Sequence, residues 1–351
     1  MVMQSNETRC LIAGGAGCLG TNLARKLLEQ GAHVDVIDNL STGRRANVDQ
    51  LSQYRNFTFT KMDVADPDIV SRFRRRRYTH VYNLACPTGV PNIERLGEQM
   101  LLASSAGTLN LLKIARRSKA RYLFASTAEA YGDPEVFPQA ENYVGRVDPV
   151  GPRSPYEEGK RFGEALTRFW GAKYDMEVRI VRIFNTYGPA MSPKDKRVIP
   201  QMLSCLIAGR PVPIYGDGTQ TRTFLHVDDL VDALLVVIEK GGNGEVYNVG
   251  GHQQITVREL FSLIKKATGL AGEAVFRDHF IEDHRGRWPD TTKLQALGWR
   301  PRVPLEAGIW QSYCDLLRSM GISPIRIERK PDHNISGSKP GSSGQFRPAA
   351  E

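Results

Sequence analysis

The 351-residue sequence has few cysteines and no long hydrophobic run, and each absence argues against a class of protein. The five cysteines are scattered, odd in number and without a Cys-x-x-Cys pair, which argues against a disulfide framework and a zinc site. We expect buried free thiols and no bound metal. No stretch approaches the roughly 20 apolar residues that span a membrane, and the polar residues 1–10 leave no room for a signal peptide. We therefore expect a cytoplasmic protein without a membrane partner.

The charge balance is basic, with 47 Lys and Arg against 38 Asp and Glu, a net charge of +9. Such a surplus suits nucleic acid, and it also suits an anionic small substrate. The densest run is Arg74–Arg77, which follows Arg72 where a short helix would lead into a strand over Thr79–Leu84. We interpret this run as a solvated helix end and expect no nucleic-acid partner.

Short apolar runs alternate with helical patterns through the first half of the chain. Strands are predicted over 9–13, 33–37, 57–61, 80–84, 120–125 and 177–183, and helices over 19–30, 106–118 and 156–174. Such an alternation implies right-handed crossovers that cover a parallel sheet on both faces. The sequence therefore predicts an α/β fold built on a Rossmann-type doubly wound parallel sheet.

The alternating pattern loosens after residue 186, which suggests a second unit. We expect a Rossmann domain over residues 1–186 with a return segment near 223–248. A smaller α/β C-terminal domain over 187–323 would then bind the substrate. Residues 324–351 include a Gly-, Ser- and Pro-rich stretch and few core-forming residues, which predicts a disordered tail.

Gly14, Gly17 and Gly20 lie between the first predicted strand and the first predicted helix. Glycines at this spacing allow a tight turn, close approach of a pyrophosphate, and close packing of the helix on the sheet. The phosphates then meet the positive end of the helix. The alternative is a plain strand–helix turn, and the position of the glycines favours a dinucleotide site.

Asp38 ends the second predicted strand, 18 residues after Gly20. A carboxylate there accepts both ribose hydroxyls and repels a 2′-phosphate, which favours NAD over NADP. Arg44 and Arg45 lie nearby and are the feature that would favour NADP. Asp63 follows the third strand, where it either contacts the adenine or caps its own loop.

Tyr156 and Lys160 are four residues apart, which places them on one face of a helix. A lysine cation close to a tyrosine stabilises the phenolate and lowers the tyrosine pKa, so that the phenol can act as a base. Thr127 stands at a predicted strand end, where it would hydrogen-bond a substrate hydroxyl. A chance pair on a helix surface is the alternative interpretation.

Further motifs accompany this pair, at 14–20, 36–39, 82–87, 107–110, 131–134, 156–161, 182–189, 216–222 and 287–290. Together they resemble the extended short-chain dehydrogenases of the NAD-dependent epimerase/dehydratase family, from about Arg9 to Leu317. Within that family the resemblance is greatest to the UDP-glucuronate decarboxylases (UDP-xylose synthases). Three stretches are more specific to these enzymes: Ala85-Cys86-Pro87, Tyr156-Glu157-Glu158-Gly159-Lys160-Arg161 and Arg287-Trp288-Pro289-Asp290.

The resemblance implies NAD as the cofactor, a UDP-sugar as the substrate, and a homodimer through helices 106–118 and 156–174. In the implied cycle, Tyr156 removes the proton of the sugar 4-hydroxyl while C4 gives its hydride to NAD. The resulting β-keto acid loses CO2, and the ketone is then reduced again. The cofactor residues implied are Gly14, Gly17, Cys18, Leu19, Gly20, Asp38, Asn39, Asp63, Leu84, Ala85, Tyr156 and Lys160.

Glu129 and Arg287 match the glutamate and arginine that assist decarboxylation in that family. Arg287 would pair with the substrate carboxylate, and Glu129 would move protons near the reacting carbon. A surface strand-end residue and a loop ion pair are the alternatives. The other substrate contacts implied are Asn185, Arg197, Tyr215 and Arg222. Solvated arginines and an aromatic core residue are the alternatives there.

Four features depart from the decarboxylase pattern, all around the sugar. Ala128 replaces a serine, Ser104 an asparagine and Ala190 an arginine, and the loop over 88–99 bears little likeness. Because a 4,6-dehydratase needs an acid at the position of Ala128, simple dehydration is disfavoured. Two alternatives to a decarboxylase remain. One is a UDP-sugar 4-epimerase or other dehydratase-type enzyme, and the other is a non-catalytic NAD sensor.

Overall fold

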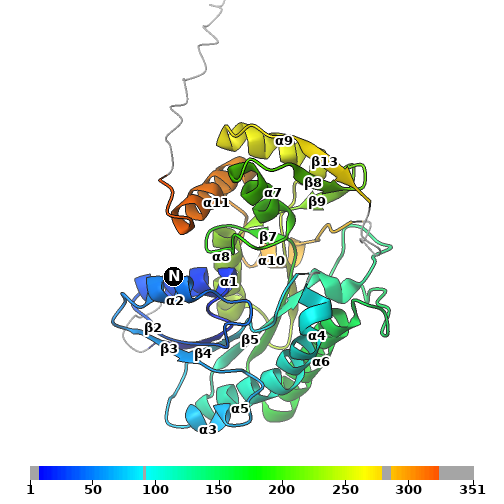
Figure 1. Ribbon diagram of the computed structural model, residues 1–351. Coiled ribbons are helices and arrows are strands. Elements are labelled where there is room, and N and C mark those ends of the chain that lie inside the picture. The colour runs from blue at the N-terminus through cyan, green and yellow to red at the C-terminus, as the bar shows by residue number, and fades with distance from the viewer. Residues whose placement is uncertain (1–7, 90–91, 279–285, 324–351) are drawn as a thin grey trace, which may run out of the picture.

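The computed structural model describes residues 8–89, 92–278 and 286–323 (Figure 1). Its centre is a seven-stranded sheet in the order β11-β6-β5-β4-β1-β2-β3, in which every pairing is parallel. The strands are β1 (Arg9–Ala13), β2 (His33–Asp38), β3 (Phe57–Lys61), β4 (His80–Asn83), β5 (Arg121–Thr127), β6 (Val178–Ile183) and β11 (Val246–Val249). The predicted Rossmann-type α/β fold is confirmed.

Helices cover both faces of the sheet (Figure 1). One face packs against α1 (Cys18–Glu29), α2 (Arg45–Leu51) and α8 (Val227–Lys240). The other packs against α3 (Ile69–Arg72), α5 (Thr108–Ser118) and α6 (Ser154–Tyr174). Because both faces are buried, the central strands are apolar runs without alternation.

The second half of the chain forms a smaller region above the carboxyl ends of the strands (Figure 1). It has its own apolar core and contains α7 (Val198–Ile207), α9 (Val257–Thr268), α11 (Leu305–Ser319), and the pairs β8 (Val212–Tyr215) with β13 (Ala274–Arg277) and β9 (Thr221–Thr223) with β12 (Gln254–Thr256). The short strands β7 (Thr186–Tyr187) and β10 (Leu225–His226) pair below it, and α10 (Thr292–Ala296) packs near β11. The chain returns to the first sheet through α8 and β11.

One predicted loop is wrong in part. Most of 88–99 belongs to α4 (Ile93–Leu102), which packs against α6. Ile93, Leu96 and Met100 are its buried residues, an apolar spacing of three and four that is typical of a helix face. A π-helical turn, Ala103–Gly107, joins α4 directly to α5.

The arginine run follows α3 and lies at the surface. Arg74, Arg75 and Arg77 are exposed, whereas Arg76 Nη1 forms an ion pair with buried Asp35 at 2.7 Å.

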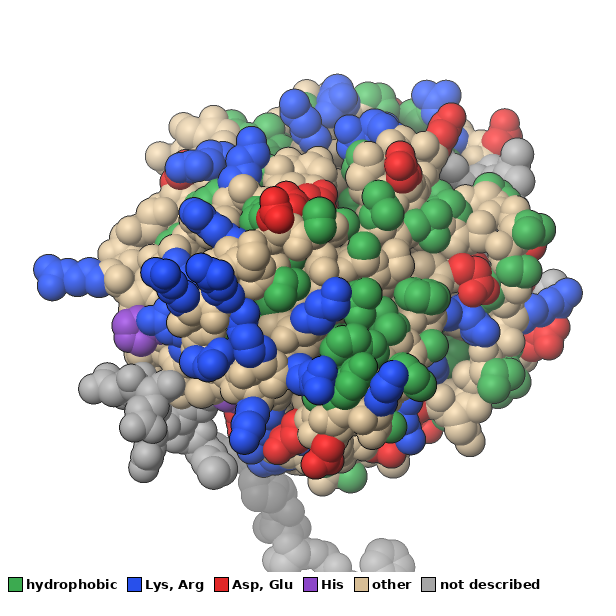
Figure 2. All heavy atoms as spheres, turned by 90° about the horizontal axis from the view of Figure 1, so that it is seen from below, with side chains coloured by type: hydrophobic (Ala, Val, Ile, Leu, Met, Phe, Trp, Pro, Cys, Tyr) green, Lys and Arg blue, Asp and Glu red, His purple; other side chains and the backbone are tan. Residues whose placement is uncertain are grey.

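Seen from below, Lys and Arg side chains gather on one part of the molecular surface and hydrophobic side chains on another (Figure 2). In the part of the chain that the structure describes, no helix is long and apolar enough to cross a membrane. Residues 324–351, predicted to be a disordered tail, lie outside the described residues.

Candidate active site

The turn between β1 and α1 carries the three predicted glycines. Gly14 has a φ of +80°, and a Cβ there would come within 2.8 Å of the Leu84 backbone. A Cβ on Gly20 would come within 2.3 Å of the Gly14 carbonyl oxygen, so α1 packs directly on the turn. Among the described residues, a Cβ on Gly17 would meet only that carbonyl oxygen, at 3.6 Å. The start of α1 is therefore open to a diphosphate, and a dinucleotide fits the turn.

Asp38 lies beside this turn, at the end of β2. Its Oδ2 accepts a hydrogen bond from the Ala16 N–H at 3.0 Å, and its Oδ1 accepts one from the Leu40 N–H at 2.8 Å. Burial raises the pKa of the Asp38 carboxyl, and the two backbone N–H groups oppose that rise. Each carboxylate oxygen has a further lone pair, which can accept a ribose hydroxyl.

The two arginines near Asp38 are bound by other acceptors. Arg44 Nη1 donates to the Met191 carbonyl oxygen at 2.9 Å. Arg45 Nε lies 2.9 Å from Asp49 Oδ1, one helical turn along α2. These contacts weaken the one feature that favoured NADP, so the geometry around Asp38 favours NAD.

Asp63 caps its own loop and also holds a neighbour of Asp38. Its Oδ1 accepts from the Ala65 N–H at 2.8 Å, and its Oδ2 accepts from Asn39 Nδ2 at 2.7 Å. A contact from Asp63 to the adenine stays a prediction. At the other end of the turn, Cys18 Sγ lies 3.1 Å from the Pro189 carbonyl oxygen, which joins α1 to the second region.

Tyr156 and Lys160 lie on the first turns of α6 and face the end of β5. The Tyr156 hydroxyl is hydrogen-bonded to Thr127, and Lys160 Nζ donates to the Ala125 carbonyl oxygen at 2.8 Å. Thr127 Oγ1 also accepts from the Glu129 N–H at 3.2 Å. The fold thus brings these predicted residues together at the carboxyl edge of a parallel sheet, where ligands of such folds bind. Their catalytic roles stay predictions.

Burial shifts both ionisable groups of this pair toward their neutral forms. It raises the pKa of Tyr156, with Cys86 acting in the same direction and the Thr127 hydrogen bond opposing it. It lowers the pKa of Lys160, against the opposing effects of Cys86 and Glu164. For the protein by itself, the net shift of the Tyr156 pKa is therefore upward, opposite to the expected direction, because desolvation is the largest effect.

Glu129 lies in the 3-10 turn Ala128–Tyr131 that follows β5, and Arg287 contacts it. Arg287 Nη2 lies 2.8 Å from Glu129 Oε2, and the arginine side chain is only 6% exposed. Arg287 Nη1 donates to the carbonyl oxygens of Ala128 and Gly132, at 2.6 and 3.1 Å. Two residues far apart in the sequence thus meet beside Thr127.

Arg153 is a residue of this site that the sequence interpretation missed. Its Nη2 donates to the same Glu129 oxygen at 2.7 Å, and its Nε lies 3.3 Å from Glu157 Oε1. The available signal was its position three residues before Tyr156 and four before Glu157, on the same side of the helix start. Burial lowers the pKa of Arg287. The negative charge of Glu129 opposes this lowering, whereas the positive charge of Arg153 lowers the pKa further.

Arg197 and Arg222 bring further positive charge to this region. Arg197 precedes α7 and lies 2.7 Å from Asp195. Burial acts to lower the pKa of Arg197, but Asp195, Cys18 and Tyr156 together outweigh it and the pKa is raised. The positive charge of Arg197 acts to lower the pKa of both Tyr156 and Cys18, so the guanidinium lies within electrostatic reach of the tyrosine and of the start of α1. Arg222, in β9, donates to the Thr221 carbonyl oxygen at 2.9 Å. Its positive charge acts to lower the pKa of Arg287.

The remaining predicted substrate contacts lie in the second region or at its border. Asn185 follows β6, and its Nδ2 donates to the Thr223 carbonyl oxygen at 3.3 Å. Tyr215 ends β8 and is only partly buried, which distinguishes it from its core neighbour Ile214. A stacking role for its ring stays a prediction.

Ser104 is buried in the π-helical turn opposite Cys86, whose Sγ lies 4.0 Å from the serine hydroxyl. A Cβ on Gly159 would lie 3.4 Å from that hydroxyl, so α6 approaches the turn closely between Tyr156 and Lys160. Short π-helical turns inside helices are frequent at functional sites. Ser104 and Cys86 therefore pack beside the turn of α6 that carries Tyr156 and Lys160.

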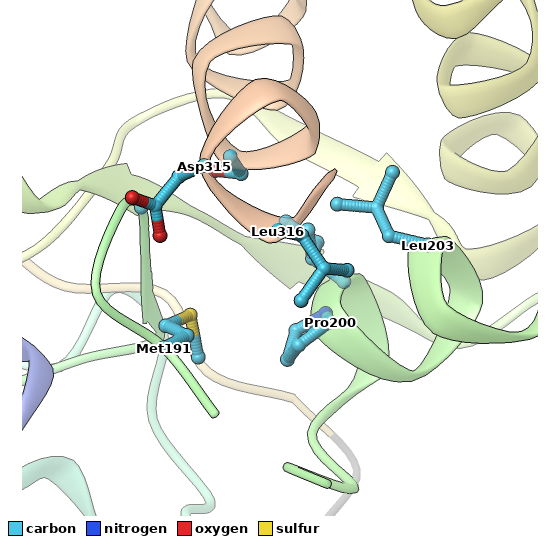
Figure 3. Close-up of a pocket in the computed structure, with 8 residues that line it drawn as sticks. Met191, Pro200, Leu203, Asp315 and Leu316 are labelled. Atoms are coloured by element: carbon cyan, nitrogen blue, oxygen red, sulfur yellow. The ribbon is translucent and has the colours of Figure 1, made fainter. Parts of the chain in front are cut away.

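Ala190 adopts a φ of +67°, and its N–H donates to Asp315 Oδ2 at 2.8 Å. Beside it lies a small pocket of about 10 Å³, whose lining includes Met191, Leu203 and Leu316 (Figure 3). That volume suits about one water molecule and no larger ligand.

A larger open pocket of about 780 Å³ lies between α4 and the start of α6, with Arg153 in its lining. Among the described residues, no cluster of His, Cys, Asp and Glu fits a metal ion.

A Rossmann sheet with this glycine turn, an acidic residue ending β2, and a Tyr–Lys pair on α6 defines an NAD-binding protein of the short-chain dehydrogenase class. The model of the NAD dependent epimerase/dehydratase family matches residues 10–250. The chain belongs to this family, and its cofactor is NAD.

Among curated relatives, UDP-glucuronic acid decarboxylase 1 of Xenopus tropicalis is 39% identical over 307 residues, 87% of this chain and 71% of that protein. UDP-glucuronic acid decarboxylase 4 of Arabidopsis thaliana is 38% identical over 302 residues, 86% of this chain and 67% of that protein.

Two solved structures have the same fold. The UDP-glucose 4-epimerase of Thermotoga maritima with UDP-glucose is 31% identical, with a TM-score of 0.82 over 89% of this chain and 100% of that one. The UDP-glucuronic acid 4-epimerase of Bacillus cereus, solved with UDP-glucuronic acid and NAD, is 26% identical, with a TM-score of 0.80 over 89% of this chain and 100% of that one.

Proposed function

We propose that this protein is a UDP-glucuronate decarboxylase that forms UDP-xylose and CO2 and regenerates its NAD in each turnover. The observation that carries the proposal is the contact between Glu129 Oε2 and Arg287 Nη2, 2.8 Å apart and beside Thr127. A sugar acid needs a cation for its carboxylate and a proton-transfer group near C5, whereas a neutral UDP-hexose needs neither. The likeness to curated decarboxylases of 38 to 39% identity supports this choice.

Each residue has a task in this reaction. Bound NAD supplies the hydride acceptor at sugar C4 and later returns the hydride. Tyr156 takes the proton of the 4-hydroxyl, and Thr127 orients that hydroxyl. Arg287 binds the carboxylate, which is β to the C4 ketone, so the electrons of the breaking bond flow into the carbonyl as CO2 leaves. Glu129 serves the proton transfer at C5, and Tyr156 gives its proton back to the 4-oxygen.

The decisive experiment is incubation of the purified protein with UDP-glucuronate and NAD. We expect release of CO2 and a UDP-pentose lighter by the mass of CO2, measured by mass spectrometry. A UDP-hexuronate of unchanged mass with inverted C4 would reject the decarboxylase. Absence of turnover with any UDP-hexose or UDP-hexuronate would reject both enzymes.

A 4-epimerase acting on UDP-glucuronate is the second candidate. Ala128, which is buried beside Glu129, favours it, because the decarboxylases carry a serine there. Similarity to an epimerase solved with UDP-glucuronic acid also supports it. In this reaction the keto sugar rotates and is reduced on its other face, so the carboxylate is retained. The mass of the product separates the two candidates.

We also infer a cytoplasmic homodimer. The sequence predicted contacts through helices 106–118 and 156–174, which correspond to α5 and α6, and we place the contact instead on α6 and on α4, which continues into α5. Leu101, Leu102, Phe162 and Phe169 are large apolar residues of these helices that are 44 to 58% exposed, and α4 packs on α6. An apolar face of this kind is typical of a surface that a partner covers. The five free cysteines are consistent with a reducing compartment.

The dimer is tested by light scattering of the Phe162→Glu/Phe169→Glu variant. We expect the wild type to be a dimer and this variant a folded monomer, because a charge in the apolar face opposes association. Val150→Glu, at a loop residue that is 90% exposed, serves as the matched control and should remain dimeric. A monomeric wild type would contradict the inference.

A further inference from the structure

The proposed function assigns no task to Arg153, although this side chain touches Glu129. Arg153 is the N-cap residue of α6, and its side chain is 13% exposed. It lies between two carboxylates, with Glu129 2.7 Å from Nη2 and Glu157 3.3 Å from Nε. Glu157 is itself buried. A planar guanidinium held at two of its edges has little freedom to turn.

The two arginines hold Glu129 in different ways. Arg153 donates an aligned hydrogen bond to Oε2, whereas Arg287 Nη2 lies 2.8 Å from the same oxygen without hydrogen-bond alignment. In the described part of the chain, Arg287 Nη2 has no aligned acceptor at all, although it is buried. Burying such a donor is costly, so a new acceptor placed there is favoured.

The other half of the Arg287 guanidinium is already fixed. Its Nη1 donates to the carbonyl oxygens of Ala128 and Gly132, which hold the plane of the group in place. A carboxylate that enters the site therefore meets a rigid arginine whose Nη2 lacks an aligned acceptor. It competes with Glu129 for that nitrogen unless Glu129 is held by another group.

We propose that Arg153 is a positioning residue that holds Glu129, so that Arg287 Nη2 is left to bind the carboxylate of the substrate. This inference rests on the proposed function, because it takes a UDP-linked sugar acid as the ligand. Without Arg153, Glu129 turns to Arg287, and the substrate carboxylate has to displace it. Arg153 then determines the preference for a sugar acid without touching the sugar.

The test compares UDP-glucuronate with UDP-glucose by calorimetric titration of the NAD-loaded protein. We expect the wild type to prefer UDP-glucuronate, and Arg153→Met to lower that preference about tenfold with UDP-glucose affinity unchanged. Since Arg153→Met leaves buried Glu157 without this partner, Arg153→Met/Glu157→Gln is measured beside it and should show the same loss. Circular dichroism establishes that each variant is folded.

Arg168→Met is the matched control. Arg168 lies on the same helix, is exposed, and its Nη1 donates to the Gly244 carbonyl oxygen, outside the turn that carries Glu129. We expect this variant to keep the wild-type preference for UDP-glucuronate.

A second readout is kcat. Arg153→Met should lower it in the wild-type background and have little further effect beside Glu129→Gln, because both changes remove one interaction.

The outcomes separate this inference from the proposed function. If Arg153→Met and its double variant keep the preference for UDP-glucuronate, or if kcat falls equally in both backgrounds, the positioning role is overturned and the decarboxylase stands. If the wild type prefers UDP-glucuronate and the variants lose the preference, but no CO2 is released, the positioning role stands and the decarboxylase is rejected. A wild type without any preference overturns the positioning role.

Discussion

Lys160 Nζ donates a hydrogen bond to the Ala125 carbonyl oxygen at 2.8 Å, and the same ammonium group lies 5.1 Å from the centre of the Phe124 ring. The lysine is thereby tied to β5 two residues before Thr127 and one helical turn beyond Tyr156. Because the group is buried, its charge is costly in the protein alone and becomes useful when a phenolate forms nearby. Two predictions follow from this placement of the charge.

The first prediction concerns stability and pH. Burial lowers the pKa of Lys160 below its unfolded value of 10.5, so over that interval the unfolded chain binds more protons than the folded one. The wild type therefore gains stability relative to Lys160→Met as the pH rises toward 10. Denaturant unfolding at several pH values measures this difference. Lys173→Met, at an exposed lysine of the same helix, should show no such trend, and parallel curves for Lys160→Met would refute the prediction.

The second prediction concerns the phenol. Tyr156→Phe removes the hydroxyl that is bonded to Thr127 and keeps the ring, so we expect turnover to fall about 10²–10⁴-fold with NAD affinity unchanged. Tyr174→Phe, at the other end of α6, is the control and should retain wild-type turnover. Steady-state kinetics and NAD titration measure both quantities. Full activity in Tyr156→Phe would show that another group is the base.

The third prediction concerns cofactor choice. Asp38→Asn removes the negative charge that we expect to bind the ribose hydroxyls, so NAD affinity should fall about tenfold. We expect little gain in NADP affinity, because Arg44 is held by the Met191 carbonyl oxygen. Asp49→Asn releases Arg45 from its ion pair outside the site and should leave NAD affinity unchanged. Tight NADP binding by Asp38→Asn would contradict this arrangement.

The fourth prediction concerns His226, the N-cap residue of α8, whose Nδ1 accepts from the Asp228 N–H at 3.3 Å. Burial lowers the pKa of His226 below 6.5, although Asp228 and Asp229 oppose this, so the folded protein holds the ring neutral. Below pH 6.5 the unfolded chain binds the extra proton, and the wild type loses stability as the pH falls.

His226→Asn keeps a capping acceptor and removes the titrating group. We expect its stability to fall less than that of the wild type between pH 7 and pH 5, as measured by denaturant unfolding. His33→Asn, at an exposed histidine, should follow the wild type. An equal fall for His226→Asn and the wild type would show that the ring is not held neutral.

Local pattern was enough to predict much of the fold. The predicted strands over 9–13 and 57–61 coincide with β1 and β3, and the other strands of the first half differ from the prediction by only one or two residues at their ends. Helix α4 was not predicted. Its apolar residues are spaced as on a helix, but the surface they cover is supplied by α6, which lies far along the chain.

The candidate site also has features that local sequence predicts and features that depend on tertiary packing. Positions such as Gly14, Asp38 and the Tyr156–Lys160 pair depend on spacing along one strand–turn–helix unit or one helix, so the sequence alone predicts their placement. The pKa of Tyr156 was predicted in the wrong direction, because the depth of burial around the phenol depends on how α6 packs against β5 and the π-helical turn.

The amino-acid sequence by itself therefore determined the parallel sheet, the nucleotide turn and the Tyr–Lys spacing, since each rests on periodicity or on bonds between near neighbours. Only the tertiary structure decided that Arg153 and Arg287 meet on one oxygen of Glu129. Those three side chains come from a helix start, a late loop and the short turn after β5. Ion pairs between such distant positions leave no periodic signal, because they exist only once packing has brought the segments within a few ångströms.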